Sequence, residues 1–134
     1  MDDDAVVDLL VQASFTVTAH LSQVAAAHDL SLTQARLLGI LRDREPRLAE
    51  LAAHLGLERS SVSGLVDRAV RRGLMRRETS ADDGRAVRLS LTEQGHALAA
   101  RGVADVGELL APMMAKLNAG ERQRLGALLA RLLD

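Results

Sequence analysis

The segment from Leu48 to Leu91 most restricts the fold of this chain, because its apolar residues repeat first at helical and then at strand spacing. Steps of three and four residues over 48–55 and 62–69 predict two short helices. Gly56 and Gly73 follow them, where a left-handed residue commonly ends a helix. After Gly73, apolar and polar residues alternate as they do in strands. The segment therefore predicts a helix-turn-helix followed by a β-hairpin.

The predicted hairpin has two alternating runs and a defined tip. Met75, Arg77 and Thr79 share one side of the first run, and Val87, Leu89 and Leu91 alternate with Arg88 and Ser90 in the second. Asp83-Gly84 lies between the two runs and supplies the positive φ angles of a tight turn. A hairpin placed directly after a helix-turn-helix is a wing.

Helical patterns cover the chain on both sides of this segment. A long first helix is expected over residues 5–28, and a shorter one begins near Ser31 and Thr33. Pro46 is expected to open the third helix, since a missing N–H is tolerated in a first turn. Two further helices are predicted to begin near Thr92 and Asn118. Pro112 is expected to bend or end the first of them.

The predicted fold class is mainly α with a small β-wing. The winged helix-turn-helix core, a DNA-binding domain, is expected over residues 32–92, and residues 1–31 and 93–134 are expected to form a helical dimerisation region. The terminal helices carry more apolar surface than so small a core can cover, which predicts a two-fold homodimer. The alternative is that these helices fold onto their own core.

Composition narrows the class of protein. A chain of 134 residues is long enough for one domain with its own core. It contains no cysteine, which excludes disulfides, thiol redox switches and thiolate metal sites. The N-terminus is acidic rather than basic, and no apolar run approaches the roughly 20 residues of a membrane span. A cytoplasmic protein without a membrane partner is expected.

Charge is concentrated around the predicted wing. Residues 59–88 hold eight arginines and four acids, a balance of +4 in a chain whose net charge is −1. A basic surplus of this kind suits a polyanionic partner, which binds through phosphate neutralisation and counterion release. Phe15 is the single aromatic residue, so base stacking, the usual means of binding single strands, lacks residues. Double-stranded DNA is therefore the predicted partner.

Three segments between Leu48 and Gly95 resemble the multiple-antibiotic-resistance regulator (MarR) family of bacterial winged-helix transcription factors. They are LAELAAHLGL, SSVSGLVDRAVRRGLMRR and DDGRAVRLSLTEQG, and their order and spacing are together specific. The resemblance implies a homodimer whose recognition helices enter two successive major grooves while the wings reach the flanking minor grooves. It also implies that the protein is a repressor relieved by a small anionic or phenolic effector.

A helical wheel divides the second short helix into an inner and an outer face. With the apolar residues placed inward, the outer face and its flanks carry serines and arginines. Serines in the first turns suit the end of a recognition helix that meets bases and phosphates. The alternative is that the serines cap the helix and the arginines are solvated. The predicted DNA-binding residues are Arg59, Ser60, Ser61, Ser63, Arg68, Arg77, Asp83 and Arg85.

Two of these residues lie at the hairpin tip. The family pattern implies that Arg85 enters the minor groove, where a narrow A·T-rich groove concentrates negative potential. Asp83 is expected to orient Arg85 or to pair with Arg77, since its own charge opposes phosphate contact. The alternative for Arg85 is an ordinary exposed hairpin arginine.

The resemblance also implies an effector pocket where the first two helices meet the winged core and the fifth helix. Phe15, His20 and Arg36 are candidates to line it, although residues such as Phe15 and Leu32 more often belong to the core. No two of the four histidines have the i, i+4 spacing that lets two imidazoles share a metal ion, and a site assembled in three dimensions is the alternative. No catalytic motif occurs, so no enzyme, catalytic residue, metal or cofactor is predicted.

The sequence as a whole predicts a transcriptional regulator that binds double-stranded DNA. It is expected to act as a ligand-responsive repressor and homodimer on a pseudo-palindromic site with half-sites about one helical turn apart. The alternative is a protein-interaction module that keeps the winged fold without binding DNA. The basic surplus over residues 59–88 favours DNA.

Overall fold

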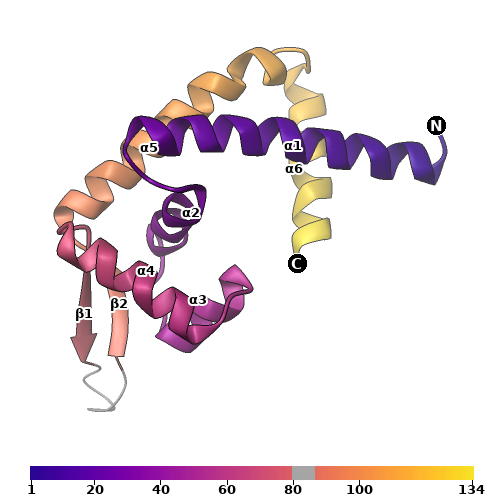
Figure 1. Cartoon of the computed structure of the whole chain (residues 1–134). Coiled ribbons are helices and arrows are strands. Elements are labelled where there is room, and N and C mark those ends of the chain that lie inside the picture. The colour runs from indigo at the N-terminus through magenta and orange to yellow at the C-terminus, as the bar shows by residue number, and fades with distance from the viewer. Residues whose placement is uncertain (80–86) are drawn as a thin grey trace.

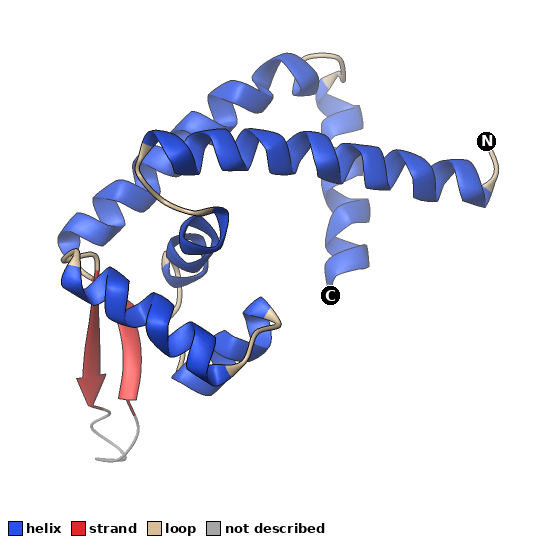
Figure 2. Cartoon of the chain, in the orientation of Figure 1, coloured by secondary structure: helices blue, strands red, loops and turns tan. Residues whose placement is uncertain are grey.

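The computed structural model describes residues 1–79 and 87–134. Within these residues the chain is mainly helical, and its strands form one two-stranded antiparallel sheet, which confirms the predicted fold class (Figures 1 and 2). In chain order the elements are α1 (Asp3–Ala27), α2 (Leu32–Leu41), α3 (Leu48–Leu55), α4 (Arg59–Arg71), β1 (Met75–Thr79), β2 (Val87–Leu91), α5 (Glu93–Met114) and α6 (Ala119–Leu133).

The core lies where α2, α3, α4, the base of the wing and the first turns of α5 meet. The apolar stripes predicted for α3 and α4 are buried there, so the helical spacing located both helices correctly. Burial of each such side chain contributes about 1.5 to 3 kcal/mol. The largest fully buried side chains are Leu37, Leu41, Leu51, Val62, Val66, Met75 and Leu89.

Helix ends follow the local signals in the sequence. The Ser31 hydroxyl accepts a hydrogen bond from the Gln34 N–H, and the Gln34 side chain accepts one from the Ser31 N–H, which forms a capping box. Asn118 caps α6 in the same way. Gly56 and Gly73 have φ angles of 65° and 76°, the left-handed conformation expected of residues that end helices.

The wing is a two-stranded antiparallel hairpin, as predicted, and is buried only at its base. Met75 lies opposite Leu91 and Arg77 opposite Leu89. Met75, Leu89 and Leu91 are buried, whereas Arg77 and Val87 are exposed because the outer part of the hairpin projects past the helices (Figure 1).

Pro46 does not open α3 as predicted. It is buried before the helix, and its carbonyl accepts a hydrogen bond from the Leu89 N–H at 2.9 Å. Arg47 forms an isolated antiparallel bridge with Arg88. The two residues before α3 therefore extend the wing sheet next to β2, and α3 begins at Leu48.

Pro112 lies inside α5, which continues to Met114. The prediction that this proline could end the helix is therefore wrong. A proline near a helix end removes one backbone donor but leaves the few remaining residues free to complete the last turn. The connection to α6 follows at Ala115, and α6 ends at Leu133.

Gly95, in the first turn of α5, marks the closest approach between backbone segments in the core. A Cβ atom added there would lie 2.0 Å from the carbonyl oxygen of Leu74. Thr92 joins the same segments: its hydroxyl donates to the Gly73 carbonyl at 2.6 Å and accepts from the Gly95 N–H at 3.0 Å. The first turn of α5 is thus packed directly against the chain between α4 and β1.

The terminal helices leave large apolar surfaces uncovered within one chain. The C-terminal part of α1 packs on α2 and α5, and Val24 and Ala25 are buried there. Towards the N-terminus, α1 extends beyond the core (Figure 1), and α6 has no buried residue. The exposed apolar residues of these two helices include Val6, Val7, Leu9, Leu10, Val11, Phe15, Leu128, Leu129, Leu132 and Leu133.

In the described part of the chain, α1 is the one helix long and apolar enough to cross a membrane by length and composition. The expectation that no apolar run approaches that length was wrong, because residues 9–27 contain no Asp, Glu, Lys or Arg. Uncharged polar residues such as Gln12 and Ser14 interrupt the run without adding charge. Core helices of soluble proteins and signal sequences pass the same test; the apolar window of α1 is not buried within the chain, whereas the C-terminal part of α1 packs on α2 and α5.

Candidate nucleic-acid interface

The outer face of α4 presents short polar side chains near its start and arginines towards its end. Arg59, Ser60 and Ser61 in the first turn are exposed, Ser63 is half-buried and Arg68 is exposed. The helix is held against α3 by its buried opposite side. Its first turn also directs unpaired backbone N–H groups outwards, which favours phosphate binding. These residues can reach a polyanion without unpacking the core.

The wing is joined to α4 by an ion pair. The Arg77 guanidinium on β1 contacts the Asp67 carboxylate on α4, and both side chains are about half exposed. Arg77 is therefore partly neutralised and helps to orient the wing against the helix. The sequence had suggested Asp83, not Asp67, as a partner for Arg77. Asp83 and Arg85, the predicted wing-tip residues, lie outside the described residues.

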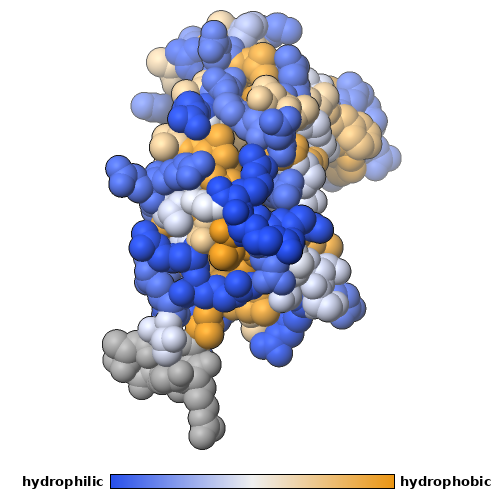
Figure 3. Space-filling view, turned by 60° about the vertical axis from the view of Figure 1, so that its left-hand side comes forward, coloured by the Kyte–Doolittle hydropathy of each residue, from blue (hydrophilic) through white to orange (hydrophobic). Residues whose placement is uncertain are grey.

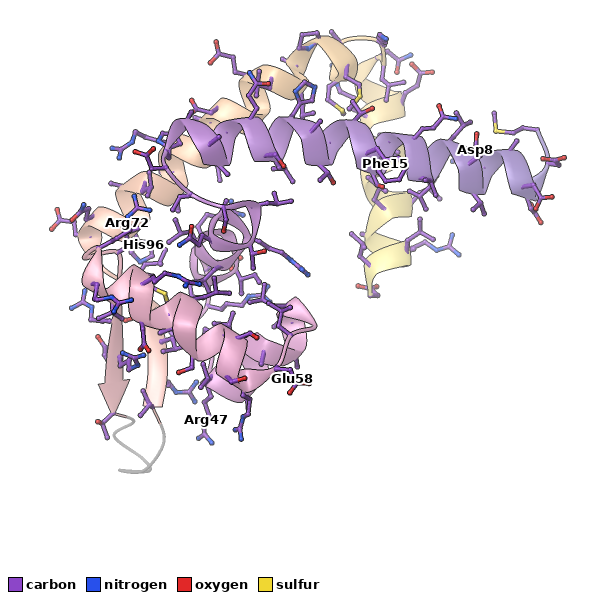
Figure 4. All side chains as sticks on the ribbon, in the orientation of Figure 1. Asp8, Phe15, Arg47, Glu58, Arg72 and His96 are labelled. Atoms are coloured by element: carbon purple, nitrogen blue, oxygen red, sulfur yellow. The ribbon has the colours of Figure 1, made fainter. Side chains whose placement is uncertain are left out.

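Sequence reasoning missed two arginines at the base of the wing. Arg88 donates a hydrogen bond to the Glu45 carbonyl at 3.0 Å. Arg47 extends from the start of α3 on the side where the wing also projects (Figure 4). The sequence around Arg47 contains no local pattern that indicates a DNA-binding role. Arg47 is placed beside Arg88 by a bridge between segments about forty residues apart.

The surface on the wing side is largely hydrophilic. Figure 3 shows hydrophilic side chains over most of this face, with hydrophobic patches between them, including at the helical end remote from the wing. Arg76 and Glu78 pair along β1 at 3.5 Å, so part of the basic surplus is balanced locally. The arginines on α4 and at the base of the wing supply the described positive charge on this side.

A cavity of about 690 Å³ lies between α1, α2 and α5. Arg36 lines it, as predicted for an effector pocket, and its guanidinium also donates to the His54 carbonyl at 3.0 Å. Phe15 and His20 are not among the residues that line this cavity, and their place in an effector site stays a prediction. Phe15 lies on the part of α1 that extends beyond the core and is 70% exposed.

The histidines lie apart from one another. His28 contacts Asp105 of α5 at 3.0 Å, and the His54 ring lies 3.2 Å from a guanidinium nitrogen of Arg44. Among the described residues, no three side chains of histidine, aspartate or glutamate converge on one point. The His28 contact joins the end of α1 to α5, and the His54 contact joins α3 to the connection that precedes it.

Comparison with known proteins adds to this geometry. A model of the MarR family matches residues 28–86. A probable transcriptional regulator from Pseudomonas aeruginosa is 30% identical, over 97% of this chain and 98% of that one, with a TM-score of 0.72. MarR from E. coli is 23% identical over 100% and 98%, with a TM-score of 0.76. NadR, solved with 4-hydroxyphenylacetate, is 25% identical over 92% and 88%, with a TM-score of 0.79. No curated protein matches the sequence.

Sequence and fold lead to the same assignment. The matched family region spans α2, α3, α4 and β1, and so includes the outer face of α4. The solved regulators match over nearly the whole chain, including the terminal helices. The chain belongs to the MarR family and is a winged helix-turn-helix transcriptional regulator of the DNA-binding class, not an enzyme.

Proposed function

We propose that this regulator acts as a homodimeric, ligand-responsive repressor that binds a pseudo-palindromic duplex through two α4 helices. The observation that carries the proposal is the exposed polar face of α4, set against a buried opposite side and joined to a basic wing by the Asp67–Arg77 pair. In this arrangement Ser60, Ser61 and Ser63 meet base edges. Arg59 and Arg68 meet phosphates.

The wing belongs to the same proposal. Arg85 enters the minor groove beside each half-site, and Asp83 orients it; both residues lie outside the described part of the chain. Arg77, held by Asp67, keeps the wing aligned with the recognition helix. Residues 32–92 form the DNA-binding unit, while residues 1–31 and 93–134 join the two copies.

The uncovered surfaces of α1 and α6 support the dimer. On α6 the leucines at 125, 128, 129, 132 and 133 share one side of the helix, and none is buried within the chain. Such a stripe is unfavourable in water and is covered when a second copy packs against it. The same contact uses the apolar N-terminal part of α1. We propose this role, rather than a membrane span, for α1, in a cytoplasmic protein.

Replacing Arg68 with alanine is expected to weaken binding to every duplex by about ten-fold, because each of the two copies then loses one exposed ion pair with phosphate, worth about 0.2 to 1 kcal/mol. The slope of log K against log salt should fall in magnitude by about 0.9 for each phosphate that is no longer neutralised. Fluorescence anisotropy of a labelled duplex, selected from a random pool by the wild type, measures both quantities.

The matched control is Lys116→Ala, which removes one positive charge from the connection between α5 and α6. It should leave the salt slope unchanged. Wild-type binding that hardly responds between about 50 and 200 mM salt would favour the protein-interaction module over a DNA-binding role. A recovered palindrome from the random pool would establish symmetry and half-site spacing together.

The effector belongs in the cavity between α1, α2 and α5. The lining is mostly apolar, and Arg36, Arg42 and Arg44 are the charged donors at its α2 side. An apolar body with an anionic group suits such a lining, because the guanidinium groups can bind a carboxylate in bidentate fashion. NadR was solved with 4-hydroxyphenylacetate, a small aromatic acid. We take the same class of ligand as the effector here.

Added 4-hydroxyphenylacetate is expected to raise the Tm of the wild type and to weaken duplex binding. At 100 times its Kd, a ligand stabilises the folded chain by about 2.7 kcal/mol. Gly39→Leu fills the cavity from α2, where an added Cβ meets no atom within 4 Å, and should abolish both effects while leaving ligand-free duplex binding intact. Calorimetry and anisotropy provide the measurements. An unchanged Tm at millimolar ligand would refute this class of effector.

A further inference from the structure

The C-terminal end of α1 is bound by a side chain from the end of the recognition helix. Arg72 is the C-cap residue of α4. Its guanidinium donates to the carbonyl of Asp29 at 3.0 Å and to that of His28 at 3.4 Å. Figure 4 shows Arg72 at the end of α4 opposite to Glu58, beside the turn that follows α1. A residue of the reading helix thus contacts the helix that extends into the proposed dimer region.

The turn that receives Arg72 is specialised. Asp29 adopts a φ of 57°, the left-handed conformation, and the Leu30 N–H bonds back to the Ala25 carbonyl at 2.9 Å. This arrangement closes α1 while leaving the carbonyls of His28 and Asp29 pointing outwards. The last turn of α1 contains no basic residue, so no side chain of its own offsets the negative end of the helix dipole. Arg72 supplies that charge from another helix.

The same turn is fixed to a third helix. The His28 side chain, which lines the cavity, contacts the Asp105 carboxylate on α5 at 3.0 Å. His28 therefore joins α5 through its ring and α4 through its carbonyl. Arg72 also lines a small pocket together with Leu30 and Leu74. Three helices meet at this turn, and one of them is the recognition helix.

We propose that Arg72 is a positioning residue for DNA recognition: it sets the orientation of α4 relative to α1 and thereby the separation of the two recognition helices in the dimer. This inference rests on the proposed homodimeric function. Without these hydrogen bonds, α4 samples orientations that fit only one half-site at a time. The apparent affinity then falls by the fraction of time spent in the competent orientation. Arg72 itself contacts no DNA in this role.

The test uses two substitutions that keep the side chain long. Arg72→Met keeps a long unbranched side chain near Leu30 and Leu74 and removes every donor. We expect about ten-fold weaker binding to the selected duplex, corresponding to a competent orientation held about a tenth of the time, with an unchanged salt slope. Arg72→Lys keeps the positive charge and an N–H donor, and should bind the duplex more tightly than Arg72→Met. Lys116→Ala again controls for net charge.

A second measurement does not depend on DNA. The chain has no cysteine, so Ser61→Cys creates one spin-label site on each α4 of the dimer. We expect a narrow distribution of distances between the two labels in an otherwise wild-type dimer and a broader one when Arg72→Met is added. Circular dichroism and light scattering check that helix content and dimer mass are unchanged.

Each outcome separates the proposals. A wild type that binds no duplex, or that remains a monomer, contradicts the proposed function before any variant is made. Given a wild type that binds duplex as a dimer, equal affinity and an equal distance distribution in Arg72→Met would overturn the positioning role. A weaker affinity with a salt slope smaller by about 0.9 or more would instead assign Arg72 to phosphate binding. If Arg72→Met and Arg72→Lys lowered the affinity equally, the positive charge that Arg72 supplies to the C-terminal end of α1 would not be what positions α4.

Discussion

Gly95→Ala is expected to abolish the folded state at physiological temperature. The added Cβ would lie 2.0 Å from the Leu74 carbonyl oxygen, and the partner is backbone, which cannot rotate away as a flexible side chain would. Either α5 moves away from the segment between α4 and β1 or the Thr92 hydrogen bonds break. Overpacking typically costs about 1 to 3 kcal/mol, and a backbone clash this close belongs at or above the upper end. Urea unfolding followed by circular dichroism measures the decrease in stability.

The matched control is Gly102→Ala, two turns further along the same helix. An added Cβ meets no atom within 4 Å at Gly102. Alanine favours the helix by about 1 kcal/mol relative to glycine, so this variant should be as stable as the wild type or more stable. If Gly95→Ala unfolded at the same urea concentration as Gly102→Ala, the close approach of α5 to Leu74 would be wrong.

Leu129→Glu is expected to convert the dimer to monomers and to lower the affinity for a two-half-site duplex by about a hundred-fold or more. Leu129 is on the leucine side of α6, which has no buried residue within the chain. A charge there is unfavourable once a second copy covers the stripe, because it loses its hydration without gaining a partner. Monomers lack the gain that linked sites provide, which reaches about 10² to 10⁴. Sedimentation and anisotropy measure the two effects.

Ala127→Glu introduces the same charge on the opposite side of α6 and is expected to leave both the mass and the affinity unchanged. A dimeric Leu129→Glu variant would place the contact between copies elsewhere. The monomer should retain its fold, because no residue of α6 is buried against the rest of the chain. Its thermal unfolding therefore reports whether α6 contributes to the core.

The winged core was predictable because its signals are local. Apolar residues at helical spacing marked α3 and α4, and Gly56 and Gly73 marked their ends, because positive φ angles favour glycine. The alternation of apolar and polar residues after Gly73 marked the two strands of the wing. These features depend on neighbours in the chain, so one sequence is enough to locate them.

Contacts between distant segments were not predictable. Nothing in the sequence indicates that Pro46 accepts a hydrogen bond from Leu89. The pairing of Arg77 with Asp67 depends on the angle between the wing and α4, which no local pattern encodes. The family resemblance placed Phe15 near a pocket, but the part of α1 that carries it extends past the core of the single chain. The base preference stays undetermined for a related reason: Gly64, in the middle of the outer face, offers no side chain with which to read a base.

The bridge at Arg47 has a consequence for how much change the chain tolerates. Since residues 46 and 47 also pair with β2, β2 lies between this short segment and β1, and β1 is an edge strand. The link between α2 and α3 is therefore not a free connection whose length can vary. An insertion there would shift the ladder and tilt the wing against α4, whereas an insertion between α5 and α6 would leave the ladder in place. Divergence in length among related chains should concentrate at the second position.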